Sequence, residues 1–218
     1  MKKILFPVFG VVFVFLSVSG IAEFSRMLSG FSIESKIELF FMIGFVAYLI
    51  VHMVFYKPVF IHVMAHELTH ALWAFLFGGK TKKLEVSSGG GRVLISKTNF
   101  LITLAPYFFP LYTFLFSIVF AIAQDRYRPY VAFFVGASLS FHIALTLYSL
   151  RSSQSDLRED SDIFFSLSFV TFMNLVVLAM ILSLISDKIS FGDFMKEMFT
   201  GTVRITAGFF GWINRVIS

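Results

Sequence analysis

One stretch of sequence decides the fold: Phe60-Ile61-His62-Val63-Met64-Ala65-His66-Glu67-Leu68-Thr69-His70-Ala71-Leu72-Trp73-Ala74-Phe75-Leu76-Phe77. It is apolar enough to cross a bilayer, where ionisable side chains are costly and therefore need a reason. On a helix, His66 and His70 lie one turn apart on the same face, so their imidazoles can bind one zinc ion. Glu67 then lies beside the ion and can take a proton from a zinc-activated water. The pattern predicts a hydrolytic zinc centre in a place where water is scarce.

The histidines of this region also have simpler interpretations. The H-E-x-x-H residues could form a buried polar cluster that joins helices through hydrogen bonds. His62 lies one turn before His66, and we interpret it as packing or as a hydrogen-bond partner of a ligand rather than as a ligand. His52 and His142 are lone histidines in apolar runs, and we interpret both as structural.

The composition indicates an integral membrane protein. Of the 218 residues, 57% are hydrophobic and only 14% are charged, whereas a soluble domain has about 25% charged residues. The mean hydropathy is +0.84. Cysteine is absent, which excludes disulfides, thiolate zinc sites and a cysteine nucleophile. We attribute the net charge of +5 to basic loops that set the membrane topology and contact anionic lipids. We expect no nucleic-acid partner.

Apolar runs along the chain predict an all-α polytopic membrane protein with about six transmembrane helices. Each run is near the ~20 residues needed to cross the hydrocarbon core. The first could be a signal peptide, but it is longer than the apolar part of such a peptide, so we favour a retained helix. Lys and Arg divide equally between the two faces, nine and nine, which leaves the orientation open. The predicted spans are roughly 4–22, 38–57, 59–78, 100–124, 130–150 and 164–186.

Two segments outside the spans have patterns of their own. After the third span, two β-prone runs flank Gly89-Gly90-Gly91 and predict a small hairpin over about 84–96, with a flexible loop as the alternative. In residues 191–218, apolar residues recur at helical spacing while Lys196 and Arg204 lie off that stripe. This predicts a C-terminal amphipathic helix in the membrane interface, with packing on the bundle as the alternative.

A catalytic zinc ion usually has three protein ligands and one open position. The third ligand must come from elsewhere in the chain, and acidic residues gather after the fifth span. A helix that ends there returns to the same membrane face as the end of the third span, so a site of two histidines and one carboxylate is possible. Most of this cluster is expected to be a solvated loop. The candidates are Asp156, Glu159, Asp160 and Asp162.

The order of these motifs resembles the site-2 protease family of intramembrane zinc metalloproteases, in its shorter, diverged bacterial branch. The resemblance covers roughly residues 38–165. It rests on H-E-L-T-H in a span, Gly78-Gly79 and the glycine-rich hairpin, then Ala105-Pro106-Tyr107-Phe108-Phe109-Pro110-Leu111, and an acidic motif one span later.

The resemblance implies that His66, His70 and a later aspartate hold the zinc. Family members commonly carry that aspartate before a glycine, and this chain has no Asp-Gly pair. By position Asp156 is the best match and Asp162 the second. Asp156 also follows the fifth span closely and precedes an apolar residue, Leu157.

The resemblance further implies an intramembrane zinc endopeptidase with about one Zn²⁺ per chain and Glu67 as general base. Its substrates would be membrane-spanning proteins. Independently of the resemblance, the internal hydrogen bonds of a substrate helix require it to unwind, and the unwound segment could pair with the hairpin edge at Val93 and Ile95. The chain would comprise a transmembrane metalloprotease domain over 1–190 and the amphipathic helix over 191–218. It would lie in a bacterial cytoplasmic membrane. The alternative is a zinc-binding membrane protein without protease activity, either a transporter or a partner-binding pseudo-enzyme.

Overall fold

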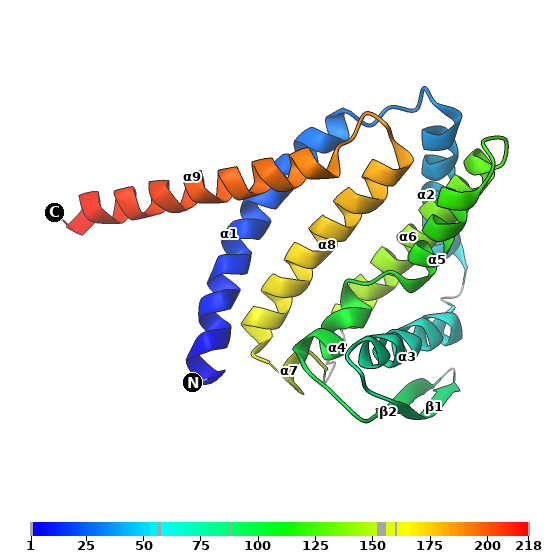
Figure 1. Ribbon diagram of the computed structural model, residues 1–218, viewed down its shortest axis with the longest axis horizontal. Coiled ribbons are helices and arrows are strands. Elements are labelled where there is room, and N and C mark those ends of the chain that lie inside the picture. Colours follow the sequence, from blue (N-terminus) through cyan, green and yellow to red (C-terminus); the bar gives the residue numbers. More distant parts are fainter. Residues whose placement is uncertain (1, 56–57, 88, 152–155, 160, 218) are drawn as a thin grey trace. The chain divides into compact units, whose positions relative to one another are not determined.

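The computed structural model describes residues 2–55, 58–87, 89–151, 156–159 and 161–217. The chain divides into two compact units (Figure 1). One unit comprises Met1–Phe31 and Asp162–Ser218, and the other comprises Ser32–Ser161. The predicted zinc ligands His66, His70 and Asp156, together with Glu67, lie in the second unit, so that unit is the one that positions the chemistry.

The first unit consists of three long helices. These are α1 (Lys2–Ser29), α8 (Ile163–Ile185) and α9 (Phe191–Ile217). Helix α1 packs along α8 through phenylalanine rings: the ring of Phe13 lies 5.2 Å from each of the rings of Phe169 and Phe172. Phenylalanine in this unit therefore serves helix packing.

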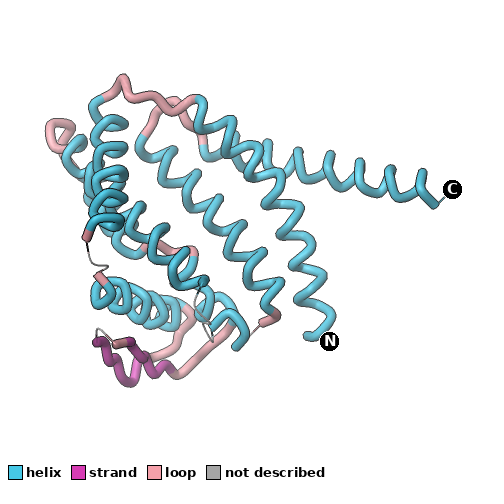
Figure 2. Tube along the Cα trace, turned by 180° about the vertical axis from the view of Figure 1, so that it is seen from behind, coloured by secondary structure: helices cyan, strands magenta, loops and turns pink. Residues whose placement is uncertain are grey.

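The second unit consists of packed helices with a small hairpin at one side. Helix α6 packs against α2 and α5, and the hairpin lies against α3 (Figure 2). Its strands pair antiparallel, with Val93 opposite Leu84 and Gly91 opposite Val86. The elements are α2 (Lys36–Val54), α3 (Val59–Leu76), β1 (Thr81–Ser87), β2 (Gly90–Ile95), α4 (Phe100–Leu104), the 3₁₀ helix η1 (Ala105–Tyr107), α5 (Leu111–Ile122), α6 (Arg128–Arg151) and α7 (Asp156–Glu159).

The predicted fold class is confirmed. In the described part of the chain, five helices are long and apolar enough to cross a membrane, or six if one sharply bent pair counts as a single span. The hairpin follows the third helix, as predicted, and a long helix ends the chain. Helix α1 is longer than the predicted first span of 4–22.

The fourth predicted span, 100–124, is not one continuous helix. The segment Phe100–Tyr107 and helix α5 meet at an angle of 76°. Pro106 and Pro110 lie at this break, and each lacks the backbone N–H that would continue a helix. The two prolines therefore account for the bend, which divides the span into two pieces.

The first half of helix α9 agrees with the alternative interpretation of the C-terminal tail, packing on the bundle. Its first half packs on α1: Phe194 and Met198 are buried, and the Ser19 hydroxyl donates to the Met198 carbonyl oxygen at 2.8 Å. Its second half leaves large apolar side chains such as Phe210 and Trp212 exposed. An interfacial location of that half, and the domain boundary at residue 190, stay predictions.

Helices α2 and α6 approach so closely that two glycines are required between them. A Cβ atom at Gly44 would overlap the carbonyl of Phe133, and one at Gly136 would overlap the carbonyl of Phe41. Such backbone contact is how small residues join helices in membranes, where burial of apolar surface supplies little driving force. The pair fixes α6, which carries Ser149 to the site.

We expect Gly136→Ala to destabilise the protein by roughly 1–3 kcal/mol, because the added methyl group forces α6 away from α2. Gly208→Ala is the control, since a Cβ atom added at Gly208 in α9 would meet nothing within 4 Å. That variant should be neutral or stabilising, as alanine favours a helix over glycine. Thermal unfolding in detergent checks this, and an unchanged midpoint for Gly136→Ala would contradict the packing.

Candidate metal centre

Three predicted ligands come together between helices α3 and α7. The Nε2 atoms of His66 and His70 are 3.2 Å apart. The Asp156 Oδ2 atom lies 3.2 Å from the His66 Nε2 atom and 3.7 Å from the His70 Nε2 atom. Within the described residues, these three side chains form the group that could hold a metal ion.

The spacing of these atoms suits zinc. With bonds of about 2.0–2.1 Å, the ligand atoms of a tetrahedral zinc site lie roughly 3.3–3.4 Å apart. The three observed distances, 3.2, 3.2 and 3.7 Å, bracket that value. Two imidazoles and one carboxylate are also a donor set of catalytic zinc sites, so both the chemistry and the spacing fit the ion.

His70 is oriented by the broken span. Its Nδ1 atom lies 2.9 Å from the Ile102 carbonyl oxygen, and since a carbonyl can only accept, Nδ1 carries the proton. In the neutral form of the ring that would bind a metal ion, the lone pair is then at Nε2, which faces the other two candidate ligands. The Ile102 carbonyl is available because its partner in a regular helix would be the N–H of residue 106, and Pro106 has none.

Asp156 stands at the start of α7, the shortest described α-helix of the second unit. Burial alone would raise the pKa of its carboxyl group. The hydrogen bond from His66 and the nearby His70 outweigh that effect and hold the pKa well below its usual range, so the group is an ionised carboxylate at neutral pH. Its Oδ2 atom also accepts a hydrogen bond from the Tyr107 hydroxyl at 3.1 Å.

Glu67 lies on α3 next to the histidines, but it faces the hairpin. Its side chain is buried, and its carboxylate accepts a hydrogen bond from the backbone N–H of Val93 in β2. A Cβ atom at Gly91 would come within 2.7 Å of the Glu67 Cγ atom and 2.5 Å of the Val63 side chain. Glycine at position 91 therefore lets the strand pass directly over the glutamate.

A cavity of about 700 Å³ connects these groups. Helix α3 forms one wall with His66, Glu67 and His70. Residues 89–95 form the opposite wall, and Asp156 also lines the cavity. The volume is in the range of small-molecule sites, about 300–1,000 Å³. It is large enough for a segment of extended polypeptide.

The structure also places the other residues considered from sequence. Val93 and Ile95 line the cavity, and their role in substrate binding stays a prediction. His62 lies within the same cavity wall, with its Nε2 atom 2.9 Å from the Ser149 hydroxyl oxygen. Asp162 belongs to the other unit and caps α8, where its carboxylate accepts from the Phe164 N–H at 2.9 Å. Asp160 lies outside the described residues.

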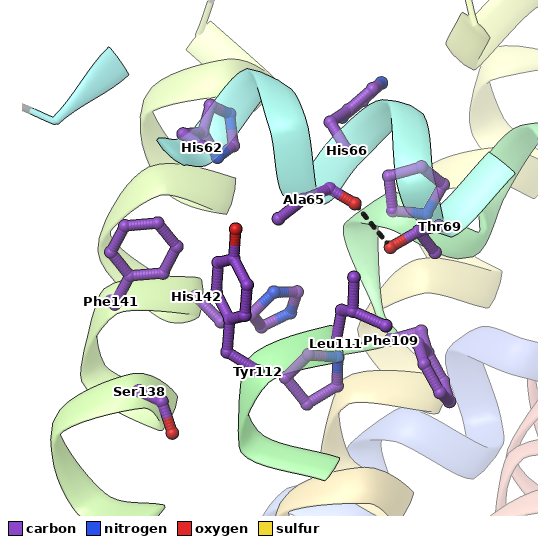
Figure 3. Close-up of a pocket in the computed structure, with 12 residues that line it drawn as sticks. His62, Ala65, His66, Thr69, Phe109, Leu111, Tyr112, Ser138, Phe141 and His142 are labelled. Atoms are coloured by element: carbon purple, nitrogen blue, oxygen red, sulfur yellow. Dashed lines mark hydrogen bonds between the residues drawn. The ribbon is translucent and has the colours of Figure 1, made fainter. Parts of the chain in front are cut away.

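A second, much smaller cavity lies on another side of α3 (Figure 3). Its volume of about 20 Å³ matches roughly one water molecule. Tyr112 points its hydroxyl toward α3, where it donates to the Ile61 carbonyl oxygen at 3.2 Å. His142, interpreted as structural from sequence, lines this small cavity together with His62 and His66.

The family comparison agrees with this geometry. The family described as Peptidase M50B-like matches residues 39–184, which is most of the chain. The chain belongs to the Peptidase M50B-like family. The resemblance to site-2 proteases that the sequence motifs carried is thereby confirmed, and the family points to a membrane metalloprotease. No curated protein and no solved structure matches the chain.

Sequence reasoning missed two contacts of the site. The Tyr107 hydroxyl and the Ile102 carbonyl each bond to a candidate ligand. The sequence contained a signal for the Ile102 contact. Pro106 stands four residues after Ile102 and has no N–H, so the Ile102 carbonyl needs a hydrogen-bond donor from outside its own helix. The sequence does not reveal that Tyr107 contacts Asp156, because the two residues are 49 positions apart along the chain.

We expect the purified protein to bind about one zinc ion per chain, and His66→Ala or His70→Ala to abolish binding, because two ligands rarely hold zinc against competition. Asp156→Ala should lower the affinity for the same reason. Asp162→Ala is the matched control: it should cost about 1 kcal/mol of stability through the lost cap and keep the zinc. Metal analysis after dialysis measures the zinc content of all four variants. Stoichiometric zinc in either histidine variant would refute the assignment of these residues as ligands.

Proposed function

We propose that this protein is an intramembrane zinc endopeptidase that hydrolyses peptide bonds of membrane-spanning protein substrates. His66, His70 and Asp156 are the zinc ligands in this proposal, and Glu67 is the general base. The observation that carries it is one cavity that joins the ligand atoms, the glutamate and the edge of β2 that faces away from β1. The family match supports the same chemistry.

The bound ion would supply a Lewis acid that acidifies a water molecule and polarises the scissile carbonyl. The Glu67 carboxylate accepts the proton of the attacking water and passes it to the leaving amine. Its burial against the hairpin keeps it out of bulk water, while the cavity gives it access to the metal position. His70, held by the Ile102 carbonyl, presents a fixed Nε2 atom to the ion.

The hairpin supplies a place for the substrate backbone. A peptide bond within a transmembrane helix is protected by its internal hydrogen bonds, so the substrate must unwind before it is cut. The Val93 N–H points at Glu67 rather than at β1, so this edge of β2 faces the cavity. A substrate carbonyl that takes the Val93 N–H would extend the hairpin by one strand and release the Glu67 carboxylate.

The remaining features support a location of this activity in the bilayer. The five or six candidate spans of the described residues support a multi-pass membrane protein, and His66, Glu67 and His70 lie on one of them. A bacterial cytoplasmic membrane is the proposed location. The exposed apolar side chains in the second half of α9 would lie at the lipid interface.

Glu67→Gln should lower cleavage of a single-span substrate by roughly 10²–10⁴-fold, because the amide keeps the shape and loses the proton acceptor. Zinc content should be unchanged. Glu85→Gln serves as the control, since that exposed glutamate pairs with Lys83 on the hairpin and should not affect cleavage. Cleavage is followed in detergent or liposomes with and without a chelator. Wild-type rates from Glu67→Gln would exclude this residue as the base.

Val93→Pro should weaken cleavage and leave the zinc in place, because proline removes the backbone N–H that the substrate strand needs. Val93→Ala keeps that N–H and should cleave at close to the wild-type rate. Cleavage assays and metal analysis on the same samples make the comparison. If the proline variant loses zinc as well as activity, the hairpin supports the fold and does not bind the substrate.

A further inference from the structure

The carboxylate ligand needs more support than the two histidine ligands. His66 and His70 lie one turn apart on α3, a helix of 18 residues, so their helix fixes their spacing. Asp156 comes from α7, which has 4 residues. Such a short helix has little stability of its own and depends on its tertiary contacts. Leu157 provides one such contact, because its side chain is 5% exposed and packs into the unit.

Tyr107 supplies a second contact, made directly to the carboxylate. Its hydroxyl donates to Asp156 Oδ2 at 3.1 Å, and this is the same oxygen that faces both histidines. A carboxylate oxygen has two lone pairs, so one can face the histidines while the other accepts from the tyrosine. A bond from a neutral donor to a charged acceptor is stronger than one between neutral groups.

The tyrosine is itself held rigidly. Its residue is 1% exposed, and its ring meets the His66 ring edge to face at a centroid distance of 5.5 Å. It ends the 3₁₀ helix η1, which contacts α3 and directly precedes the break between Tyr107 and Leu111. The same short segment provides the Ile102 carbonyl that orients His70. The broken span thus contacts all three candidate ligands.

We infer that Tyr107 is a positioning residue of the metal centre, whose buried hydroxyl holds the Asp156 carboxylate with Oδ2 facing His66 and His70. The inference rests on the proposed zinc site. Without the hydroxyl, the carboxylate would be free to turn toward the cavity, and ordering it on metal binding would cost conformational entropy. Partners of this kind are typically worth a factor of about ten to a hundred in metal affinity.

Tyr107→Phe tests the inference, because it keeps the ring on His66 and removes only the hydroxyl. We expect the zinc affinity, measured by competition with chelators, to fall by about 10–100-fold. Tyr112→Phe is the matched control: it removes a hydroxyl that donates to the Ile61 carbonyl, so the zinc affinity should not change. Thermal unfolding of both metal-free variants verifies that each still folds.

Two further readouts separate positioning from a general structural role. In cobalt-substituted protein, Tyr107→Phe should alter the visible absorption of the metal, whereas Tyr112→Phe should not. In an Asp156→Ala background, Tyr107→Phe should cause no further loss of affinity, because its partner is gone. Wild-type affinity in Tyr107→Phe, or an undiminished loss in the Asp156→Ala background, overturns the inference. A wild-type protein that binds no zinc would instead refute the proposed function on which the inference stands.

Discussion

The hydrogen bond from His70 to the Ile102 carbonyl is the contact on which the rest of the site depends. In an apolar environment, a backbone polar group without a hydrogen-bond partner costs free energy. In a regular helix the N–H of residue 106 would donate to the Ile102 carbonyl, but Pro106 has no N–H. His70 satisfies that carbonyl and in return has its Nε2 lone pair fixed toward the metal position. One missing N–H thus accounts for the orientation of a candidate ligand.

The contact between strand β2 and helix α3 also depends on the backbone. Gly91 lets β2 lie directly on α3, and the Val93 N–H then reaches the Glu67 carboxylate. A side chain at position 91 would lift the strand and separate the base from the hairpin edge. The absence of a single methyl group at position 91 therefore sets the spacing between the proposed general base and the proposed binding edge.

Local patterns predicted much of this structure, and contacts distant in sequence account for the rest. Hydropathy located the spans, and the glycine turn located the hairpin, because both depend on neighbouring residues. Hydropathy also predicted one continuous span over 100–124, because the segments before and after the break are both apolar. A hydropathy average over about 20 residues does not detect a bend between them. The first half of α9 packs on α1, a contact that no local pattern of the tail could distinguish from burial in lipid.

Part of the candidate site could also be predicted from the sequence. The i, i+4 spacing of the two histidines places them on one face of a helix, so their proximity was predictable. The meeting of Asp156 with His66 and Tyr107 depends on how α3, α6 and the broken span pack, which one sequence does not reveal.

The short helix α7 would give a metal ion at this site a mechanical role in addition to its proposed chemistry. His66 and Asp156 are 90 residues apart in sequence, so an ion bound by both closes a loop that contains the hairpin, the broken span and α6. In an unfolded chain, closing a loop of that length costs several kcal/mol of entropy, and the coordinate bonds offset this cost in the folded state. The ion would then act as a cross-link in a chain that has no cysteine with which to make one. The same bonds that activate a nucleophile would hold the second unit together.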